Sequence, residues 1–229
     1  MSAAALLNPV KELPAGTTMP LVSWFSANRF ECVSELDDGE RFRYDIYLQA
    51  KAFESAQCVN WFGLLSGTPD FWQHLDARHA GRVTPVPRLS ALCSEGPVGE
   101  ELTINQVLYT SVKPPALISE LWLKITAKLD WKQALGHVVA LRFADGMQSV
   151  GYHNWEPEPG PARPPGIAYL WLGASRPILF RNAEKKITKR YTFMDGTLFV
   201  ALPDSWDSWQ FQVPKSKGCH APSILLIFK

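Results

Sequence analysis

The sequence has few cysteines and no cysteine motif. Its four cysteines are widely separated and form no Cys-x-x-Cys pair; they are Cys32, Cys58, Cys93 and Cys219. A zinc knuckle needs closely spaced thiolates, and a disulfide framework is typical of small, cysteine-rich secreted domains. We therefore expect neither, and we predict reduced thiols that are mostly packed in the core.

The sequence also lacks an excess of charge of either sign. Lys plus Arg number 23 and Asp plus Glu number 22, so the molecule as a whole has no field that attracts nucleic acid or an anionic membrane. Binding of that kind would need a local patch. No apolar run approaches the roughly 18 residues of a membrane span, and we expect none.

The first twenty residues lack the features of a targeting peptide. They contain Lys11 and Glu12 but no arginine, and their apolar stretch is short and not flanked by charge. Secretory signals and mitochondrial presequences need those features. We therefore expect an intracellular protein, and the sequence leaves its compartment open.

Three widespread catalytic motifs are missing as well. The chain has no glycine-rich phosphate loop, no Gly-x-Ser-x-Gly elbow and no His-Glu-x-x-His helix, which argues against the enzyme classes that use them. Hydrophobic residues make up 46% of the 229 residues. This is enough to bury a sizeable core in one β-rich domain.

What is present divides the chain near residue 41. Three prolines and Gly16 interrupt residues 1–20, and Trp24 and Phe25 follow them. Breakers followed by apolar side chains are typical of an irregular segment that packs on something. We interpret residues 1–41 as an N-terminal docking arm and residues 42–229 as the main domain.

The first part of the main domain mixes strand, helix and loop patterns. Residues 42–48 alternate apolar and polar side chains, which predicts a strand, and apolar steps of three and four predict helices over 50–65 and 115–129. Residues 84–112 are interrupted by prolines and glycines and predict a loop-rich lid over a binding site.

After Trp131 the pattern changes to short apolar runs separated by turn residues. Runs of this length and spacing predict strands of a sandwich or jelly roll. The seven expected strands cover residues 138–143, 167–172, 178–181, 191–193, 197–201, 209–213 and 224–228.

The order of motifs in this half resembles the AlkB-like family of iron(II)- and 2-oxoglutarate-dependent oxygenases, in particular its nucleic-acid dealkylases. The similarity lies in residues 142–146, 150–153, 167–176, 195–200 and 209–214, and less specifically in 44–73 and 86–88. It covers about residues 42–229. It implies a fold that is mainly β with flanking helices, a double-stranded β-helix or cupin-like jelly roll.

The resemblance also implies where a metal would bind, and most of those positions have lost their ligands. The family holds iron(II) with a His-x-Asp pair and a second histidine. Here the pattern aligns with His153 and Trp155, and the second histidine position is Phe211. Glu156 and His220 are alternative ligands only if the chain follows a different path, so His153 is the one surviving ligand type.

The positions that the resemblance assigns to 2-oxoglutarate are altered too. The family uses an Asn, a Tyr and two arginines, and an arginine fork suits a carboxylate. The matching residues here are Leu141, Phe143, Ser223 and Lys229, of which only Lys229 keeps a charge. We therefore expect that both iron and 2-oxoglutarate binding have been lost.

Three functional hypotheses follow from this degenerate pattern. The first is a catalytically inactive AlkB-like protein that serves as a structural or interaction subunit with protein partners in a larger assembly. The second is a nucleic-acid-binding protein, and the third is an active oxygenase with the ligands His153, Glu156 and His220. For the second, the candidate contacts are Arg88, Lys185, Lys186, Lys189 and Arg190.

Two alternatives remain open at particular residues. His153 is either a relic ligand or a structural histidine, and the second is the more frequent case for a lone histidine in an apolar framework. Trp155 and Phe211 either form an aromatic platform for a base or fill the space that the metal site leaves. We favour the filled cavity, because an empty one would reduce stability.

Overall fold

The computed structural model describes residues 30–32, 46–94, 96–131, 136–154, 166–183, 186–203 and 208–229. Most of the arm expected over residues 1–41 lies outside these ranges, as do Trp155, Glu156 and Lys185. Of the arm, β1 (Glu31–Cys32) pairs with β2 (Ile46–Gln49) at the end of a large sheet, and Phe30 is buried.

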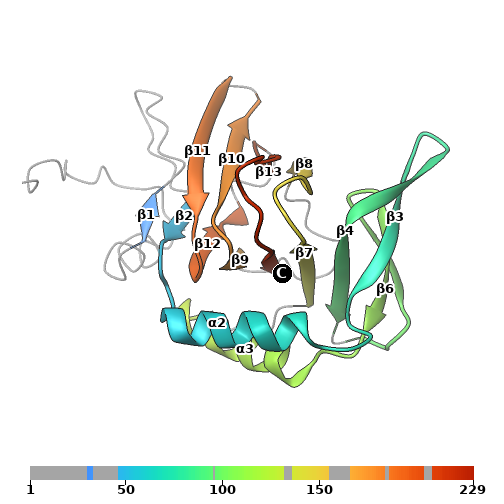
Figure 1. Ribbon diagram of the computed structural model, residues 1–229, viewed down its shortest axis with the longest axis horizontal. Coiled ribbons are helices and arrows are strands. Elements are labelled where there is room, and N and C mark those ends of the chain that lie inside the picture. Colours follow the sequence, from blue (N-terminus) through green and yellow to red (C-terminus); the bar gives the residue numbers. More distant parts are fainter. Residues whose placement is uncertain are drawn as a thin grey trace, which may run out of the picture.

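Two sheets, antiparallel apart from one pairing at the edge of the larger sheet, face each other and form a jelly roll (Figure 1). Along the chain, the path alternates between a large and a small sheet, as in a double-stranded β-helix: β7, β9, β12 and β14 lie in the large sheet, and β8, β10, β11 and β13 form the small one. The strands are β7 (His137–Phe143), β8 (Val150–Asn154), β9 (Ile167–Gly173), β10 (Arg176–Asn182), β11 (Ile187–Phe193), β12 (Thr197–Ala201), β13 (Trp209–Val213) and β14 (Ser223–Phe228).

The seven strands expected after Trp131 are confirmed, and β8 is an eighth that the pattern did not predict. Burial explains their sequences. All six residues of β14 are buried, because both faces of the large sheet are covered, whereas β10 alternates buried and half-buried residues. A sheet with one solvated face requires that alternation, so the small sheet is the outer wall of the jelly roll.

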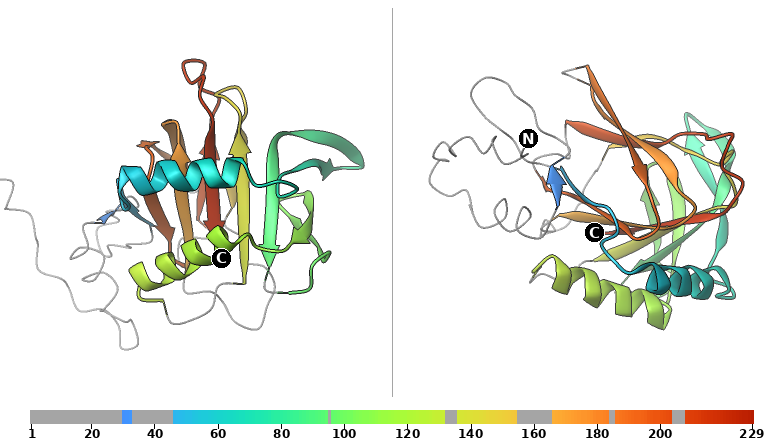
Figure 2. Two further views of the ribbon diagram at one scale, coloured as in Figure 1. Left: turned by 60° about the horizontal axis from the view of Figure 1, so that its bottom comes forward. Right: turned by 60° about the vertical axis from the view of Figure 1, so that its left-hand side comes forward.

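Two helices cover the outer face of the large sheet (Figure 2). They are α2 (Ser55–Ser66), which ends at Gly67, and α3 (Ala116–Lys128). Both confirm the expected helices, and each buries one apolar face against the sheet, centred on Trp61 in α2 and on Leu121 in α3. In the part of the chain that the structure describes, no helix is long and apolar enough to cross a membrane.

The loop-rich character expected for the lid-like region 84–112 is wrong, because this region is largely strand. It contains most of β4 (Arg82–Ser94) together with β5 (Glu101–Ile104) and β6 (Val107–Val112), and β3 (Gln73–His79) precedes it. β4 pairs with β7 and so extends the large sheet beyond the jelly roll. Pro85 and Pro87 misled the prediction; both are exposed and lie where the β3–β4 register shifts, so their missing N–H groups are tolerated.

Candidate functional site

The two positions that the resemblance assigns to histidine ligands are neighbours across the small sheet. His153 on β8 pairs with Phe211 on β13, and their ring centroids are 6.2 Å apart in an edge-to-face arrangement. Phe211 is buried among the side chains between the two sheets. The phenyl ring therefore lies where a second imidazole would be needed, and it offers no lone pair to a metal.

Aromatic rings fill the interior from Phe211 to the far end of the jelly roll. Successive ring centroids are between 4.8 and 6.2 Å apart, distances at which aromatic pairs attract each other. We call these eight rings the aromatic column. In order of contact they are Phe143, Trp171, Phe193, Phe180, Phe199, Tyr169, Phe211 and His153.

The positions assigned to 2-oxoglutarate face this column. Phe143 is fully buried and stacks on Trp171 at 5.8 Å, and Leu141 is buried two residues before it. Ser223 is also fully buried, and its hydroxyl has no hydrogen-bond partner among the described residues. Apolar side chains and a short hydroxyl replace the donors that a dicarboxylate would need, so these residues do not fit 2-oxoglutarate at this end.

A buried arginine closes the same end of the interior. The Arg176 guanidinium donates to the carbonyl oxygens of Asp145 at 3.0 Å, Gly146 at 3.3 Å, Gln148 at 2.8 Å and Pro214 at 2.7 Å. It thereby joins the start of β10 to the β7–β8 turn and to the end of β13. Its donors are used for structure and not for a ligand.

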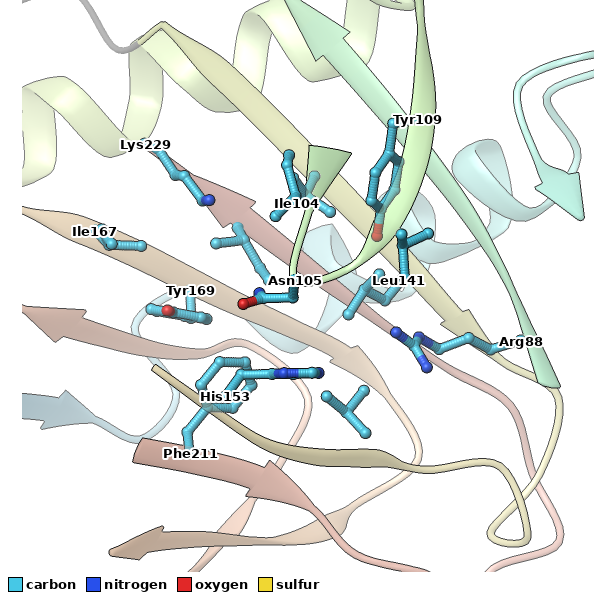
Figure 3. Close-up of a pocket in the computed structure, with 14 residues that line it drawn as sticks. Arg88, Ile104, Asn105, Tyr109, Leu141, His153, Ile167, Tyr169, Phe211 and Lys229 are labelled. Atoms are coloured by element: carbon cyan, nitrogen blue, oxygen red, sulfur yellow. The ribbon is translucent and has the colours of Figure 1, made fainter. Parts of the chain in front are cut away.

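A small cavity of about 40 Å³ remains at the opposite end of the column (Figure 3). Small-molecule sites usually measure about 300–1,000 Å³, whereas water needs only about 10–15 Å³. The lining residues come from both sheets and from the β5–β6 turn. They include Arg88, Asn105, Tyr109, His153, Phe211 and Lys229.

Arg88, which the sequence suggested as a candidate nucleic-acid contact, lines this cavity. The side chain is only 9% exposed, and its Nη1 donates to the Ser149 carbonyl at 3.1 Å. Tyr109, also buried, lies beside it. Burial raises the pKa of Tyr109 and lowers the pKa of Arg88, and the proximity of the two groups opposes both shifts.

The positive charge of Arg88 near His153 disfavours a metal cation at this position. Burial, and then that charge, lower the pKa of His153 to about 4. The imidazole is therefore neutral at pH 7, which is the form that binds metals. Within the described ranges, no three His, Cys, Asp or Glu side chains are grouped to hold a metal ion. The described residues at this position do not fit the iron site that the resemblance implies.

His220 lies far along the chain path from His153. Its neighbour Cys219 accepts a hydrogen bond from the Gly146 amide, which fixes this loop against the β7–β8 turn, and the His220 side chain is exposed. His153 instead lies near the end of β8, after Val150 and Tyr152. The structure thus does not bring His220 and His153 into one ligand set.

The basic residues expected to contact phosphates do not share one face. Lys186 is exposed at the β10–β11 turn and Arg190 is exposed on β11, but Lys189 is half-buried. Adjacent residues on a strand point to opposite faces, so Lys189 and Arg190 project to opposite sides of the small sheet. The cluster in the sequence is therefore divided in space.

Two of the described cysteines, Cys58 and Cys93, are not nucleophile candidates in this fold. Cys58 and Cys93 are free and buried. Burial, reinforced by Asp195, raises the pKa of Cys58 to about 11, and burial raises the pKa of Cys93 to about 12. Both are protonated at neutral pH and unreactive, in agreement with the expected packed thiols.

Sequence reasoning missed Tyr109 and the interior position of Arg88. A signal was present, because buried residues alternate with more exposed ones in both strands. In β4 the buried residues are Val86, Arg88 and Ser90, between Pro85, Pro87 and Leu89, and in β6 they are Val107, Tyr109 and Ser111. This period of two indicates strands with one inward face. The prolines concealed it, because proline is usually a sign of loops.

The two facing sheets, the alternating chain path and the helical layer define the AlkB-like fold of the 2-oxoglutarate- and iron(II)-dependent oxygenases. An oxidoreductase of the 2OG-Fe(II) oxygenase family from Burkholderia pseudomallei is similar, with a TM-score of 0.53 and 12% identity over 96% of this chain and 92% of that one. OsALKBH1 is similar with a TM-score of 0.51 and 11% identity, over 83% of this chain and 100% of that one.

These similarities concern the fold alone, because the identities are so low. No protein-family model matches the sequence, and no curated protein matches it either. The fold that the sequence motifs implied is confirmed. Function must be argued from the site, since one fold supports many activities.

Proposed function

We propose that this chain is a non-catalytic protein with the fold of a 2-oxoglutarate oxygenase, and that it acts as a structural or interaction subunit of a larger assembly. The aromatic column is the observation that carries the proposal. It fills the interior with rings from Phe143 to His153, including the position that the resemblance assigns to a second histidine.

The packing of the column favours a structural role for these residues. Phe180, Phe199 and Trp171 are almost completely buried, and a buried aromatic side chain contributes a few kcal/mol to stability. An interior of this kind stabilises the jelly roll without a cofactor. The function is then more readily carried by the outer surface than by the interior.

The helical layer offers a candidate contact surface. Val59 and Leu64 on α2 and Leu123 on α3 are 63%, 55% and 70% exposed. Large exposed apolar side chains are enriched where proteins associate, although single ones are common. They support the interaction role more directly than the divided basic cluster supports nucleic-acid binding.

An activity assay tests the non-catalytic half of the proposal. The full-length protein, incubated with iron(II), ascorbate, oxygen and 2-oxoglutarate, should form succinate no faster than the matched His153→Ala variant. Succinate formation that requires His153 would overturn this half.

The mass of the assembly in cell extract tests the interaction half. We expect the full-length protein to elute in a complex of defined composition, and Val59→Glu, Leu64→Glu or Leu123→Glu should release it. Val98→Glu is the matched control, because Val98 is 68% exposed but lies before β5. An unaltered, solitary monomer in extract would count against this half.

A further inference from the structure

Arg88 is a buried cation with an incomplete set of partners. Its guanidinium donates to the Ser149 carbonyl and is hydrogen-bonded to Tyr109, and its Nε has no hydrogen-bond partner in the described part of the chain. No Asp or Glu side chain lines its cavity among the residues that the structure assigns there. A buried charge without a counter-ion is unfavourable, so the site favours any anion that can enter.

The other polar groups around the cavity are also suited to an anion. Figure 3 shows Arg88, Tyr109, Asn105 and Lys229 directed toward the same space from different elements. Tyr109 presents a hydroxyl, Asn105 an amide and Lys229 a second positive charge. Asn105 lies in the exposed β5–β6 turn with a positive φ of 48°, at the rim of the cavity.

We propose that this cavity is a binding site for a small oxyanion, a carboxylate or a phosphate group, held by the Arg88 guanidinium with Tyr109 beside it. A guanidinium matches two oxygens of such a group, and charge-assisted hydrogen bonds of this kind are strong. A poorly hydrated site strengthens the attraction further.

The dimensions restrict what enters. A cavity of about 40 Å³ accommodates the charged head of a ligand, whereas a larger body has to extend past Asn105 toward solvent. The apolar walls formed by Leu141, Ile167 and Ile227 suit a ligand with a short hydrocarbon part as well as the bare anion.

The cavity overlaps the positions that the resemblance assigns to the co-substrate, because Leu141 and Lys229 line it. Its anchor is different, because Arg88 lies on β4 and at none of the positions 141, 143, 223 and 229. It needs no metal. The inference therefore goes beyond the proposed function and stands independently of it.

Thermal unfolding of the full-length, metal-free protein tests the site. The probes are inorganic phosphate and acetate, each compared with chloride at the same ionic strength. A probe that binds should raise the Tm by about 5–10 °C at one hundred times its Kd, and the stronger of the two probes identifies the source of the oxyanion. No rise above chloride for either probe would overturn the proposal.

Two variants show whether Arg88 is the anchor. Arg88→Met should fold, because it removes an unfavourably buried charge, and should lose the anion-dependent rise in Tm. Arg142→Met is the matched control: Arg142 pairs with Leu89 on β4, its guanidinium lies toward Ser66, and it does not line the cavity. An equal anion effect in wild type and Arg88→Met would contradict the assignment.

The outcome is separable from that of the activity assay. Anion binding without succinate formation supports both proposals, and absence of anion binding leaves the non-catalytic proposal in place. Succinate formation that depends on His153 would overturn only the latter.

Discussion

The two ends of the jelly-roll interior each contain a buried arginine, and the two arginines are used differently. Arg176 donates to four carbonyl oxygens and lies over the Phe143 ring, 5.4 Å from its centroid. Arg88 donates to one carbonyl and faces a cavity. The first guanidinium is held by four backbone acceptors, whereas the second has one and adjoins a cavity.

At the Arg176 end, aromatic packing and hydrogen bonds to the backbone occupy the interior. At the Arg88 end, the positive charge is still available to an external group.

Removing a ring from the column should have the largest effect. Trp171 is fully buried and contacts both Phe143 and Phe193, so Trp171→Ala should lower the free energy of unfolding by about 3–5 kcal/mol. Urea denaturation measures this change. Leu123→Ala, at a position 70% exposed, should change stability by less than about 0.5 kcal/mol. Equal effects would show that the column does not support the fold.

Replacing the two arginines should change the free energy of unfolding differently at the two ends of the interior. Arg176→Met leaves the carbonyls of Asp145, Gln148 and Pro214 without their donor and should cost about 3 kcal/mol. Arg88→Met should be neutral or stabilising in anion-free buffer, since an unpaired buried charge is removed. Chemical unfolding of both variants in the same buffer provides the comparison. A larger loss of stability for Arg88→Met than for Arg176→Met would contradict this expectation.

The pH dependence of stability should show that His153 is buried in its neutral form. Its folded pKa of about 4 lies below the value of 6.5 for an exposed histidine, so between these values the unfolded chain binds a proton that the folded chain does not. Stability from this group is complete above pH 6.5, falls as the pH decreases, and levels off below pH 4. Allowing for its partial exposure, the loss is about 2–3 kcal/mol.

The measurement compares wild type with His153→Gln across this pH range. The variant should lack this part of the pH dependence, so the stability difference between the two proteins should change with pH. A constant difference would mean that His153 is not buried in a neutral form.

Neutralising the exposed basic residues should have the smallest effect. Lys186→Ala and Arg190→Ala should each alter the free energy of unfolding by less than about 0.5 kcal/mol. Binding to single-stranded oligonucleotides at low salt distinguishes the alternative function. Binding that weakens steeply with salt and is lost in these variants would support a nucleic-acid role.

The fold was largely predictable from the sequence, because hydrophobic periodicity and turn residues are local signals. The helices ending near Gly67 and Leu129 and the seven C-terminal strands follow from them. Strand β4 was not predictable in this way, because its exposed prolines resemble loop residues, although Val86 and Arg88 point inward. The fold family itself was visible only through the resemblance.

The site was predictable in part. The pairing of His153 with Phe211 agrees with their expected positions, but the full aromatic column depends on contacts between distant strands that no local pattern specifies. Arg88 was identified as a candidate contact, but its burial was not predicted, because burial of a charge depends on tertiary packing. The prediction for Trp155 lies outside the described residues.

The most direct test of the central claim is calorimetric titration of manganese(II), as an iron substitute, in the presence of 2-oxoglutarate. We predict no saturable one-to-one binding by the wild-type protein, and a gain of weak metal binding in Phe211→His, which adds an imidazole opposite His153. Tight, 2-oxoglutarate-dependent binding by the wild type that disappears in His153→Ala would contradict the account.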